Sequence, residues 1–547
     1  MKDCTRRLLV LSTAMLASLA FSGCSADYYK RSADKEVYRI LSHKKKAALN
    51  DETPFTIEQT TADYLQGLPR RMQPIIPSHE GGEQPKGPEP TILSLSDALR
   101  IGMRNSREYQ RRKEQVYLAA LDLTRERDRF SPTLTALLSG RYHRSATDES
   151  WAGDSKFGIS QLLATGGEVS LKLTSSLLRY TTGAPREGAA SSLALEIVQP
   201  LWRGAGQRIA QENLTQAERN VVYELRSFAR YHKTFAVSIV TQYYQILQQR
   251  AVVRNQWNNY RQLAMARERA ESLAEAGRRP AFEVDQARQD ELRARDRYIR
   301  AAQRYEELLD GFKRTLALPP DVPIDVNEAD LERLMSEGIQ HPEISLEDAI
   351  RQALSLRLDL INAEDAVADA ERKVRVARNG LGPDVDLVLS ATAPTEPTQP
   401  ARFRFGRTDY SAGLDVSLPV ERTAERNTYR RTLIELERAR RSADDLRDQV
   451  RQQVRQAWRN LQEARESYEI QRKSLELAQR RVESMPDLIE GGRATTRDLL
   501  ESQAALLEAQ NALAQVLVDH LIARLELWRD VETLTVGPDG EMKGPNS

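Results

Sequence analysis

Residues 276–283 read AGRRPAFE, and residues 490–498 read EGGRATTRD. Each stretch is a short, glycine-bearing break between two very long, charged segments whose apolar residues recur at heptad-like spacing. Glycine has no Cβ and can end a helix, and Pro280 suits the first turn of the helix that follows. The pattern predicts two long helical hairpins, each an extended strut, and we expect function at the exposed tips.

Composition limits the class of protein. The chain has 547 residues with 80 basic and 79 acidic side chains, so its overall charge does not attract nucleic acid or an acidic substrate. Charged residues make up 29% and aromatic residues only 6%, which suits long solvated helices better than one thick globular core. Both cysteines, Cys4 and Cys24, fall near the start, so the mature chain is predicted to have no internal disulfide and no thiolate metal cluster.

The N-terminus has the pattern of a secretory signal. A basic start precedes an apolar run over residues 8–21, followed by Ser-Gly-Cys at residues 22–24. The alternative is a transmembrane anchor, which needs about 20 apolar residues, more than this run supplies. Cys24 in this setting resembles the cysteine of the bacterial lipobox, which is lipidated on sulfur and becomes the mature N-terminus. By the same resemblance, Ser25 rather than Asp after it implies sorting to the outer membrane.

Residues 1–23 are therefore predicted to be a lipoprotein signal peptide, and residues 24–91 a lipid-anchored tether. The tether is expected to be mostly extended, because it combines a lysine run at residues 44–46 with five prolines around Gly81 and Gly82. No other segment has the pattern of a transmembrane helix. If the mature chain enters a bilayer, we expect it to do so as a β-barrel.

The chain repeats itself from residue 94 onward. Residues 94–100 (SLSDALR) recur as residues 345–351 (SLEDAIR), each with a small polar N-cap, an acidic first turn and an amphipathic continuation. The two helices are expected to reach about Phe130 and Asn379. The predicted domains are repeat 1 (residues 92–330), repeat 2 (residues 331–536) and a flexible tail (residues 537–547).

Strand patterns follow each of these helices. Apolar and polar residues alternate at residues 133–138, 169–174, 193–198, 385–390 and 412–418. One apolar and one polar face suit a barrel wall with lipid outside and water inside, although each strand alone could equally edge a soluble sandwich. The first repeat is longer here, and residues 157–163 and 168–177 are predicted to form an additional hairpin. The sequence leaves open whether this hairpin joins the barrel or projects from it.

The order of these features resembles the TolC-like outer-membrane factors, the outer membrane efflux protein family, over about residues 92–536. The resemblance includes residues 199–206 (QPLWRGAG) after the first set of strands, residues 417–420 (SLPV) after the second, and residues 498–503 (DLLESQ) after the second tip. It implies an α+β membrane protein with long antiparallel coiled-coil hairpins, which form an α-barrel in a homotrimer, and strands of a shared outer-membrane β-barrel.

The resemblance also implies a function. The chain would be a passive exit duct of a tripartite efflux or type I secretion system, located in the bacterial outer membrane and extending into the periplasm. Its partners would be a periplasmic adaptor (membrane fusion) protein, an inner-membrane pump of RND, ABC or MFS type, and outer-membrane lipid, with no nucleic acid. The alternative is a lipid-anchored periplasmic coiled-coil scaffold that forms no pore. The alternating strands favour the duct.

Matching the family motif residue by residue places a periplasmic gate at the tips. Asp498 and Glu501 fall at the family's two acidic ring positions, and Glu283 falls at the corresponding acidic position of the first hairpin. Such a ring would favour cations. The chain departs from the family at the closed-state latch, where Ile489 and Ala494 stand in place of a tyrosine and an arginine. The alternative interpretation of the acidic residues is a solvated helix face.

The tips are also the expected adaptor-docking surface. In the family, grooves beside the tips receive the adaptor, which makes five residues candidates: Gly277, Arg278, Arg279, Gly492 and Arg493. The alternative is turn chemistry for the glycines and solubility for the arginines.

No catalytic chemistry is indicated by the sequence. The six histidines are scattered without metal-ligand spacing, and no nucleophile–base motif or phosphate loop is present. His520, on the apolar seam of the last helical segment, is expected to be packed or to face the tunnel rather than to bind metal. We therefore expect no enzyme activity, no cofactor and no metal site.

Overall fold

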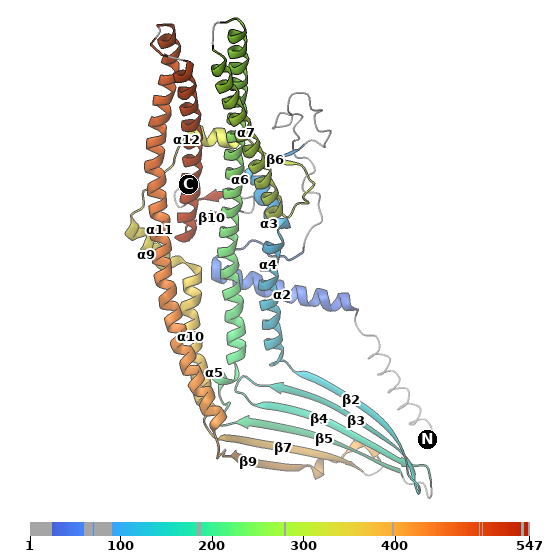
Figure 1. Cartoon of the computed structure of the whole chain (residues 1–547). Helices are drawn as coiled ribbons and strands as arrows, with labels where there is room; N and C mark the ends of the chain where they lie inside the picture. Colours follow the sequence, from blue (N-terminus) through green and yellow to red (C-terminus); the bar gives the residue numbers. More distant parts are fainter. Residues whose placement is uncertain are drawn as a thin grey trace. The chain divides into compact units, whose positions relative to one another are not determined.

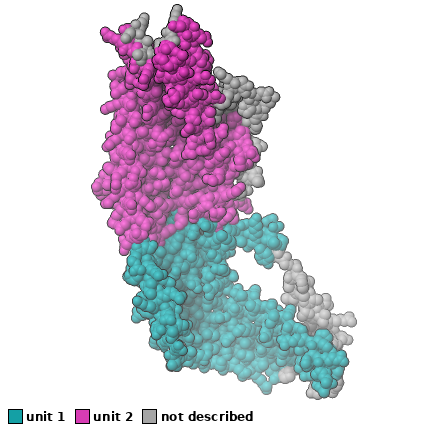
Figure 2. Space-filling view, viewed as in Figure 1, with its two compact units in different colours: residues 1–56, 115–226, 364–442 teal, residues 57–114, 227–363, 443–547 magenta. Residues whose placement is uncertain are grey.

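The computed structural model describes residues 25–58, 69, 90–182, 187–277, 280–396, 399–418, 420–491, 493–494, 496–537 and 541–544. The chain forms two compact units, each built from three segments (Figure 2). Unit 1 takes residues 1–56, 115–226 and 364–442, and unit 2 takes residues 57–114, 227–363 and 443–547. Both units draw on both halves of the chain, and the predicted repeat boundary after residue 330 stays a prediction.

Unit 1 contains a curled antiparallel sheet (Figure 1). Its order is β2-β3-β4-β5-β7, and β7 also pairs with β9 and with the short β8. The predicted stretches of alternating residues all lie in strands of the structure, except for Leu418, the last residue of the stretch 412–418, which follows the end of β9. The strands are β2 (Thr133–Arg144), β3 (Glu149–Leu162), β4 (Glu168–Tyr180), β5 (Glu187–Pro200), β7 (Asp384–Glu396), β8 (Gln399–Phe403) and β9 (Asp409–Ser417).

The additional hairpin, β3 with β4, lies within this sheet. β3 pairs with β2 from Thr133↔Ser160 to Arg144↔Glu149, and β4 pairs with β5 along almost its whole length. The turn between β3 and β4 depends on Gly166, whose φ is +92° and whose added Cβ would come within 2.6 Å of a backbone oxygen. The sequence left the position of this hairpin open. In the structure, it lies between β2 and β5 within the sheet.

Cross-strand register separates apolar and polar residues onto two faces of the sheet. Residues directly opposite each other in antiparallel strands share a face, and successive residues alternate. One row across the sheet is apolar: Leu134, Ile159, Leu171, Leu195, Ala391 and Tyr410. The adjacent row, on the other face, is polar: Thr133, Ser160, Ser170, Glu196, Ser390 and Ser411. Large members of the apolar row are exposed, Leu134 at 77% and Tyr410 at 79%.

Unit 1 also contains α2 (Ala26–Leu49), where a mostly extended tether was expected. The prediction of an extended chain is wrong for these residues. Val37, Ile40 and Leu41 recur at helical spacing and are buried, and the Tyr117 hydroxyl of α4 (Arg107–Asp128) donates to Asp34 at 2.5 Å. The apolar stripe is hard to see in the sequence, because it consists of three buried apolar residues in a helix of 24 and charged residues surround it.

A buried carboxylate joins two helices of unit 1, α6 (Glu212–Glu275) and α10 (Leu358–Asn379). Asp369 accepts hydrogen bonds from Tyr223 at 2.7 Å, Gln216 at 3.0 Å and Arg372 at 2.7 Å, and pairs with Arg219. Burial alone would raise the pKa of Asp369, but these donors outweigh it and hold the pKa below its ordinary value. The short α5 (Gln207–Ala210) precedes α6.

Unit 2 contains the ends of two long helical hairpins, as predicted. The first joins α6 to α7 (Ala281–Leu316), and the second joins α11 (Thr423–Glu490) to α12 (Thr496–Asp530). The core between α6 and α7 is built from large side chains such as Tyr243, Tyr298 and Phe312, all at most 2% exposed. None of the helices in the described residues is both long and apolar enough to cross a bilayer.

Smaller elements pack against this core. Ser94 and Ser345 each accept a hydrogen bond from the backbone three residues on, which confirms the predicted N-caps. The helices that follow are shorter than predicted, because the chain leaves the helical conformation at Ser106 and Arg357. The elements are β1 (Thr91–Leu93) parallel to β6 (Ile324–Val326), α3 (Leu95–Asn105), α8 (Ala329–Glu337) and α9 (Leu346–Leu356).

The end of the chain is partly ordered. β10 (Thr535–Val536) pairs with β11 (Met542–Lys543), and Met542 packs against the core of unit 2. The expectation of a flexible tail over residues 537–547 is therefore wrong for residues 542–543. The side chains of Val536 and Met542 both pack this segment against the core.

Candidate functional site at the hairpin tips

The first tip, between α6 and α7, depends on glycine and proline. The backbone N–H of Gly277 donates to the carbonyl of Ala274 at 2.9 Å, with a φ of +69° at the glycine. A residue with a Cβ adopts this left-handed conformation only at a cost. Pro280 occupies the N-cap of α7 with a φ of −74°. The predicted turn chemistry is confirmed at Gly277, whereas Arg278 and Arg279 lie outside the described residues.

The second tip, between α11 and α12, is closed by one carbonyl. The Leu488 oxygen accepts two backbone N–H groups, from Arg493 at 2.8 Å and from Ala494 at 3.1 Å. This arrangement satisfies a carbonyl that the end of a helix would otherwise leave unpaired. α11 continues past Pro486 to the tip, so the proline does not end the helix. Gly492, the docking glycine predicted at this second tip, lies outside the described residues.

The acidic gate candidates occupy the first turns after the tips. Glu283 is in the first turn of α7 and Asp498 is in the first turn of α12; both are partly buried. The N-terminal end of a helix stabilises such negative charge, so this placement has a structural benefit of its own. Glu501 is more exposed and pairs with Arg497, Nε to Oε1 at 3.3 Å. All three acidic residues belong to unit 2, and both of its tips point to the same end (Figure 1).

Ser502 gives the second tip a rigid support that the sequence analysis missed. Its hydroxyl is fully buried and donates to the backbone oxygen of Asp498 at 2.6 Å. This bond lies within α12 and links Ser502 to the helix turn that contains Asp498 and Glu501. The signal was a small polar residue four positions after Asp498, the spacing at which serine reaches back to a helix carbonyl.

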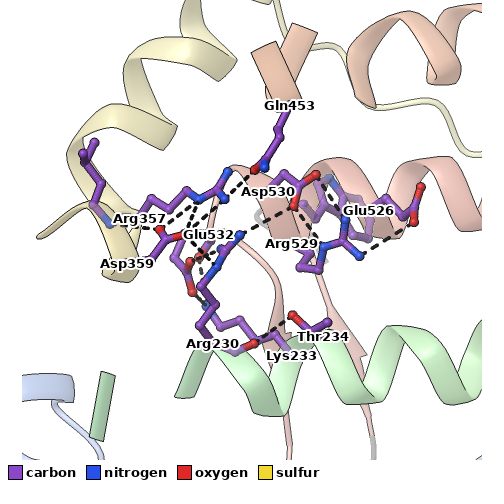
Figure 3. Close-up of polar contacts among 12 residues, drawn as sticks. Arg230, Lys233, Thr234, Arg357, Asp359, Gln453, Glu526, Arg529, Asp530 and Glu532 are labelled. Atoms are coloured by element: carbon purple, nitrogen blue, oxygen red, sulfur yellow. Dashed lines mark hydrogen bonds and ion pairs between the residues drawn. The ribbon is translucent and has the colours of Figure 1, made fainter. Parts of the chain in front are cut away.

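A buried ionic cluster farther along unit 2 was also missed (Figure 3). Glu532 accepts from Arg230 at 3.0 Å and pairs with Lys233 at 2.8 Å, and Arg230 also pairs with Asp359 at 3.2 Å. Arg357, itself buried, donates three hydrogen bonds to Asp359. The members come from segments far apart in sequence, so no local spacing could reveal them. Because opposite charges are paired here, the cluster joins the ends of helices.

Two histidines meet in unit 2. His520 is 2% exposed, and its Nε2 lies 3.2 Å from Nδ1 of His341. The other ring nitrogen of His341 lies 3.2 Å from the side-chain nitrogen of Gln462. Burial, together with the neighbouring His341 and Arg524, lowers the pKa of His520 to about 4. His520 is thus packed, one of the two places predicted for it, and the described residues contain no group of three potential metal ligands.

Comparison with known proteins finds one matching family. The family described as "Outer membrane efflux protein" matches residues 349–529, which include α12 and the second tip.

This part of the chain is similar to the outer membrane efflux protein family.

One curated member, the outer membrane efflux protein BepC of Brucella suis biovar 1 (strain 1330), is 25% identical over 201 residues. The match spans 37% of this chain and 44% of BepC, less than half of that protein's length.

Solved structures show the same fold. CusC, described in terms of folding and transmembrane channel formation, is similar with a TM-score of 0.57 and 13% identity, covering 85% of this chain and 99% of CusC. The Campylobacter jejuni CmeC outer membrane channel gives a TM-score of 0.58 and 14% identity, covering 82% of this chain and 86% of CmeC. The combination of long helices with a curled sheet is therefore the fold of these solved channel structures. The matched family and these two structures are transport proteins rather than enzymes.

Proposed function

We propose that three copies of this chain form an outer-membrane channel, the exit duct of a tripartite efflux or type I secretion system. The strands of unit 1 would contribute to a shared barrel in the outer membrane. The helical hairpins would form an α-barrel in the periplasm with the tips at its mouth. The duct has no catalytic cycle of its own, so an inner-membrane pump of RND, ABC or MFS type supplies the energy.

The two-faced sheet carries this proposal. An apolar row of large side chains, including Leu134 and Tyr410, is exposed in the single chain, next to a polar row on the other face. Apolar surface of this kind is unfavourable in water and suits contact with lipid. A periplasmic scaffold without a pore has no need for such a sheet. The efflux name of BepC and the channel descriptions of CusC and CmeC support the same function.

We further propose that the acidic residues at the tips form the gate. Threefold symmetry would repeat Glu283, Asp498 and Glu501 around the tunnel mouth, where converging carboxylates favour cations. With Ile489 and Ala494 at the family's latch positions, the closed state requires other contacts. The partly buried position of Asp498 suits a charge that has to stay in place.

The remaining sites concern partners. We propose that a periplasmic adaptor docks beside the tips, at Gly277, Arg278, Arg279, Gly492 and Arg493. The conformation of Gly277 keeps one of these turns tight, as a docking surface requires. Lipidation of Cys24 would anchor the mature N-terminus in the outer membrane.

The proposal is tested by purifying the full chain from membranes in mild detergent. We expect a trimer mass by light scattering, heat-modifiable migration on gels, and conductance after reconstitution into planar bilayers. A monomer with no conductance would overturn the duct and favour the lipid-anchored scaffold. Labelling with a radioactive fatty acid, with Cys24→Ala as the matched control, tests the anchor separately.

A further inference from the structure

Among the residues that the structure describes, the β3–β4 hairpin has no counterpart in the second half of the chain. Between α4 and α6 the chain forms four long strands, whereas between α10 and α11 it forms two, β7 and β9, with the short β8 between them. β8 pairs only with residues 395–396 of β7, beyond the stretch that pairs with β9. Each copy therefore supplies six full-length strand positions: β2, β3, β4, β5, β7 and β9.

The two edge strands of this sheet contain no lysine. β2 and β9 are exposed along almost all of their residues, and neither contains a proline. Leu134 and Leu138 on β2 are 77% and 64% exposed, and Tyr410 and Leu414 on β9 are 79% and 57% exposed. Long, flat, apolar edges pair with other chains unless lysine, proline or a bulge prevents it. Both edges are therefore suited to another strand.

Strand direction identifies that strand. Every neighbouring pair among the six is antiparallel, so directions alternate across the sheet. Because six is an even number, β2 and β9 run in opposite directions. β9 of one copy can consequently pair with β2 of the next in antiparallel fashion, and the same contact repeated around an axis closes a ring. The occupant of each edge is a second copy of this chain.

We infer that three copies close a wall of eighteen strands, and that the β3–β4 hairpin sets the width of this wall. The inference rests on the proposed trimeric duct. Strands about 4.8 Å apart and tilted by about 40° form a ring roughly 36 Å across between backbones with eighteen strands, and roughly 24 Å with twelve. The polar row, with Ser390 and Ser411, lines the inside, so the wall admits bulky hydrophilic solutes, polypeptides included.

Cysteine pairs test the ring. One cysteine is placed on β2 (Thr135, Leu137 or Ser139) and one on β9 (Ser411, Gly413 or Asp415), in all nine combinations. We expect oxidation to give covalent dimers and trimers in at least one combination on non-reducing gels. The matched control moves the β2 cysteine to Thr174 on the interior strand β4, where no link between copies should form. A complete lack of links with β2 would overturn the ring.

The width is tested by deleting residues 145–186, which removes β3 and β4 and brings β2 beside β5 in antiparallel orientation. The reporter is Ser390→Cys, on the polar face of β7 in both proteins, labelled in the purified trimer with maleimide-linked polymers of graded size. The size limit is the diameter of the largest polymer that labels the reporter. In the deletion variant we expect this limit to be about two thirds of its value in the full chain. Protein without Ser390→Cys serves as the labelling blank.

The outcomes separate the inference from the proposed function. Trimers with equal size limits in both proteins would overturn the eighteen-strand wall and leave the duct standing. Loss of trimers in the full chain would overturn both. Should the deletion variant fail to fold, cysteine pairs at Thr133/Ser160 and Ser170/Glu196, directly opposite in the register, test the wall in the full chain. Both disulfides are expected in intact trimers, and their absence there would contradict a hairpin within the wall.

Discussion

At the residue scale, the second tip combines charge with rigidity. Asp498 and Glu501 lie three residues apart on α12, so they occupy neighbouring positions on its surface. The buried hydroxyl of Ser502 bonds to the backbone of Asp498, while Glu501 forms an exposed pair with Arg497. Asp498 is the more enclosed of the two charges, and Glu501 is the more exposed.

The gate prediction follows from this difference. Asp498→Ala combined with Glu501→Ala should lower cation preference in single-channel recordings, because a ring of carboxylates would lose its charge. The fold should persist, since neither side chain is part of the buried core. Glu526→Ala, on the same helix but near its other end, is the matched control and should leave selectivity unchanged. Unchanged selectivity in the double variant would count against the gate.

His520 makes a second prediction at this scale. Its pKa is about 4 in the folded chain, against about 6.5 when unfolded. Since the unfolded state binds the proton more readily, stability is fully present above pH about 6.5 and is lost as the pH falls toward 4. The loss is about 1.4 kcal/mol per pH unit and roughly 3 kcal/mol in all. Arg465 and Arg524 also lower the pKa of His520, because they repel its protonated ring. At the neighbouring His341, Glu343 acts in the opposite direction and raises the pKa.

Thermal unfolding of the purified protein at pH 7 and pH 5 measures this effect. His520→Gln should reduce the difference in Tm between the two values, because the titrating group is gone. His43→Gln, at an exposed position on α2, is the control and should leave the difference as it is in the parent. An equal pH dependence in the His520 variant and the parent would refute the assignment.

At the scale of elements, α2 shows how few contacts order a segment. Its burial rests on Val37, Ile40 and Leu41, and its polar contacts on Asp34 with Tyr117 and on Lys45 with Asp51. The Lys45 ammonium also donates to the backbone oxygen of Thr53 at 3.0 Å, beyond the end of the helix. The helix is thereby fixed to unit 1 along one side.

Leu41→Ala should release this helix. Leu41 is fully buried, and removing such a side chain costs about 2–5 kcal/mol. We expect faster hydrogen exchange in residues 26–49, with the rest of the chain unchanged. Tyr29→Ala, at a 62% exposed position, is the control and should leave exchange as in the parent. Unaltered exchange in the Leu41 variant would show that the helix does not depend on this contact.

At the scale of the whole molecule, the two faces of the sheet decide where the chain can reside. Leu195 belongs to the apolar row, and its neighbour Ala194 points to the polar face. Leu195→Arg should deplete the protein from outer-membrane fractions, since a lipid-facing arginine near the bilayer midplane costs about 2–4 kcal/mol. Ala194→Arg should be tolerated. Equal amounts of the two variants in the membrane would contradict a lipid-facing apolar row.

Much of this architecture follows from local pattern. The heptad spacing around residues 276–283 and 490–498 predicts the helical hairpins, Ser94 and Ser345 predict two helix starts, and period-two alternation predicts the strands. In each case the deciding interactions lie within a few residues: a capping bond, a glycine with positive φ, or an apolar stripe. The efflux family could be recognised because these local features recur in a fixed order.

Only the tertiary structure decided which segments meet. The sequence shows that β3 and β4 are strands, but their insertion between β2 and β5 depends on cross-strand pairing over the whole sheet. α2 was missed because its stripe becomes visible only against α4. Ser502, the His341–His520 contact and the cluster around Glu532 join groups whose burial depends on packing. Local bonds form wherever the right residues are close in sequence, whereas burial and pairing require the folded chain to bring distant residues together.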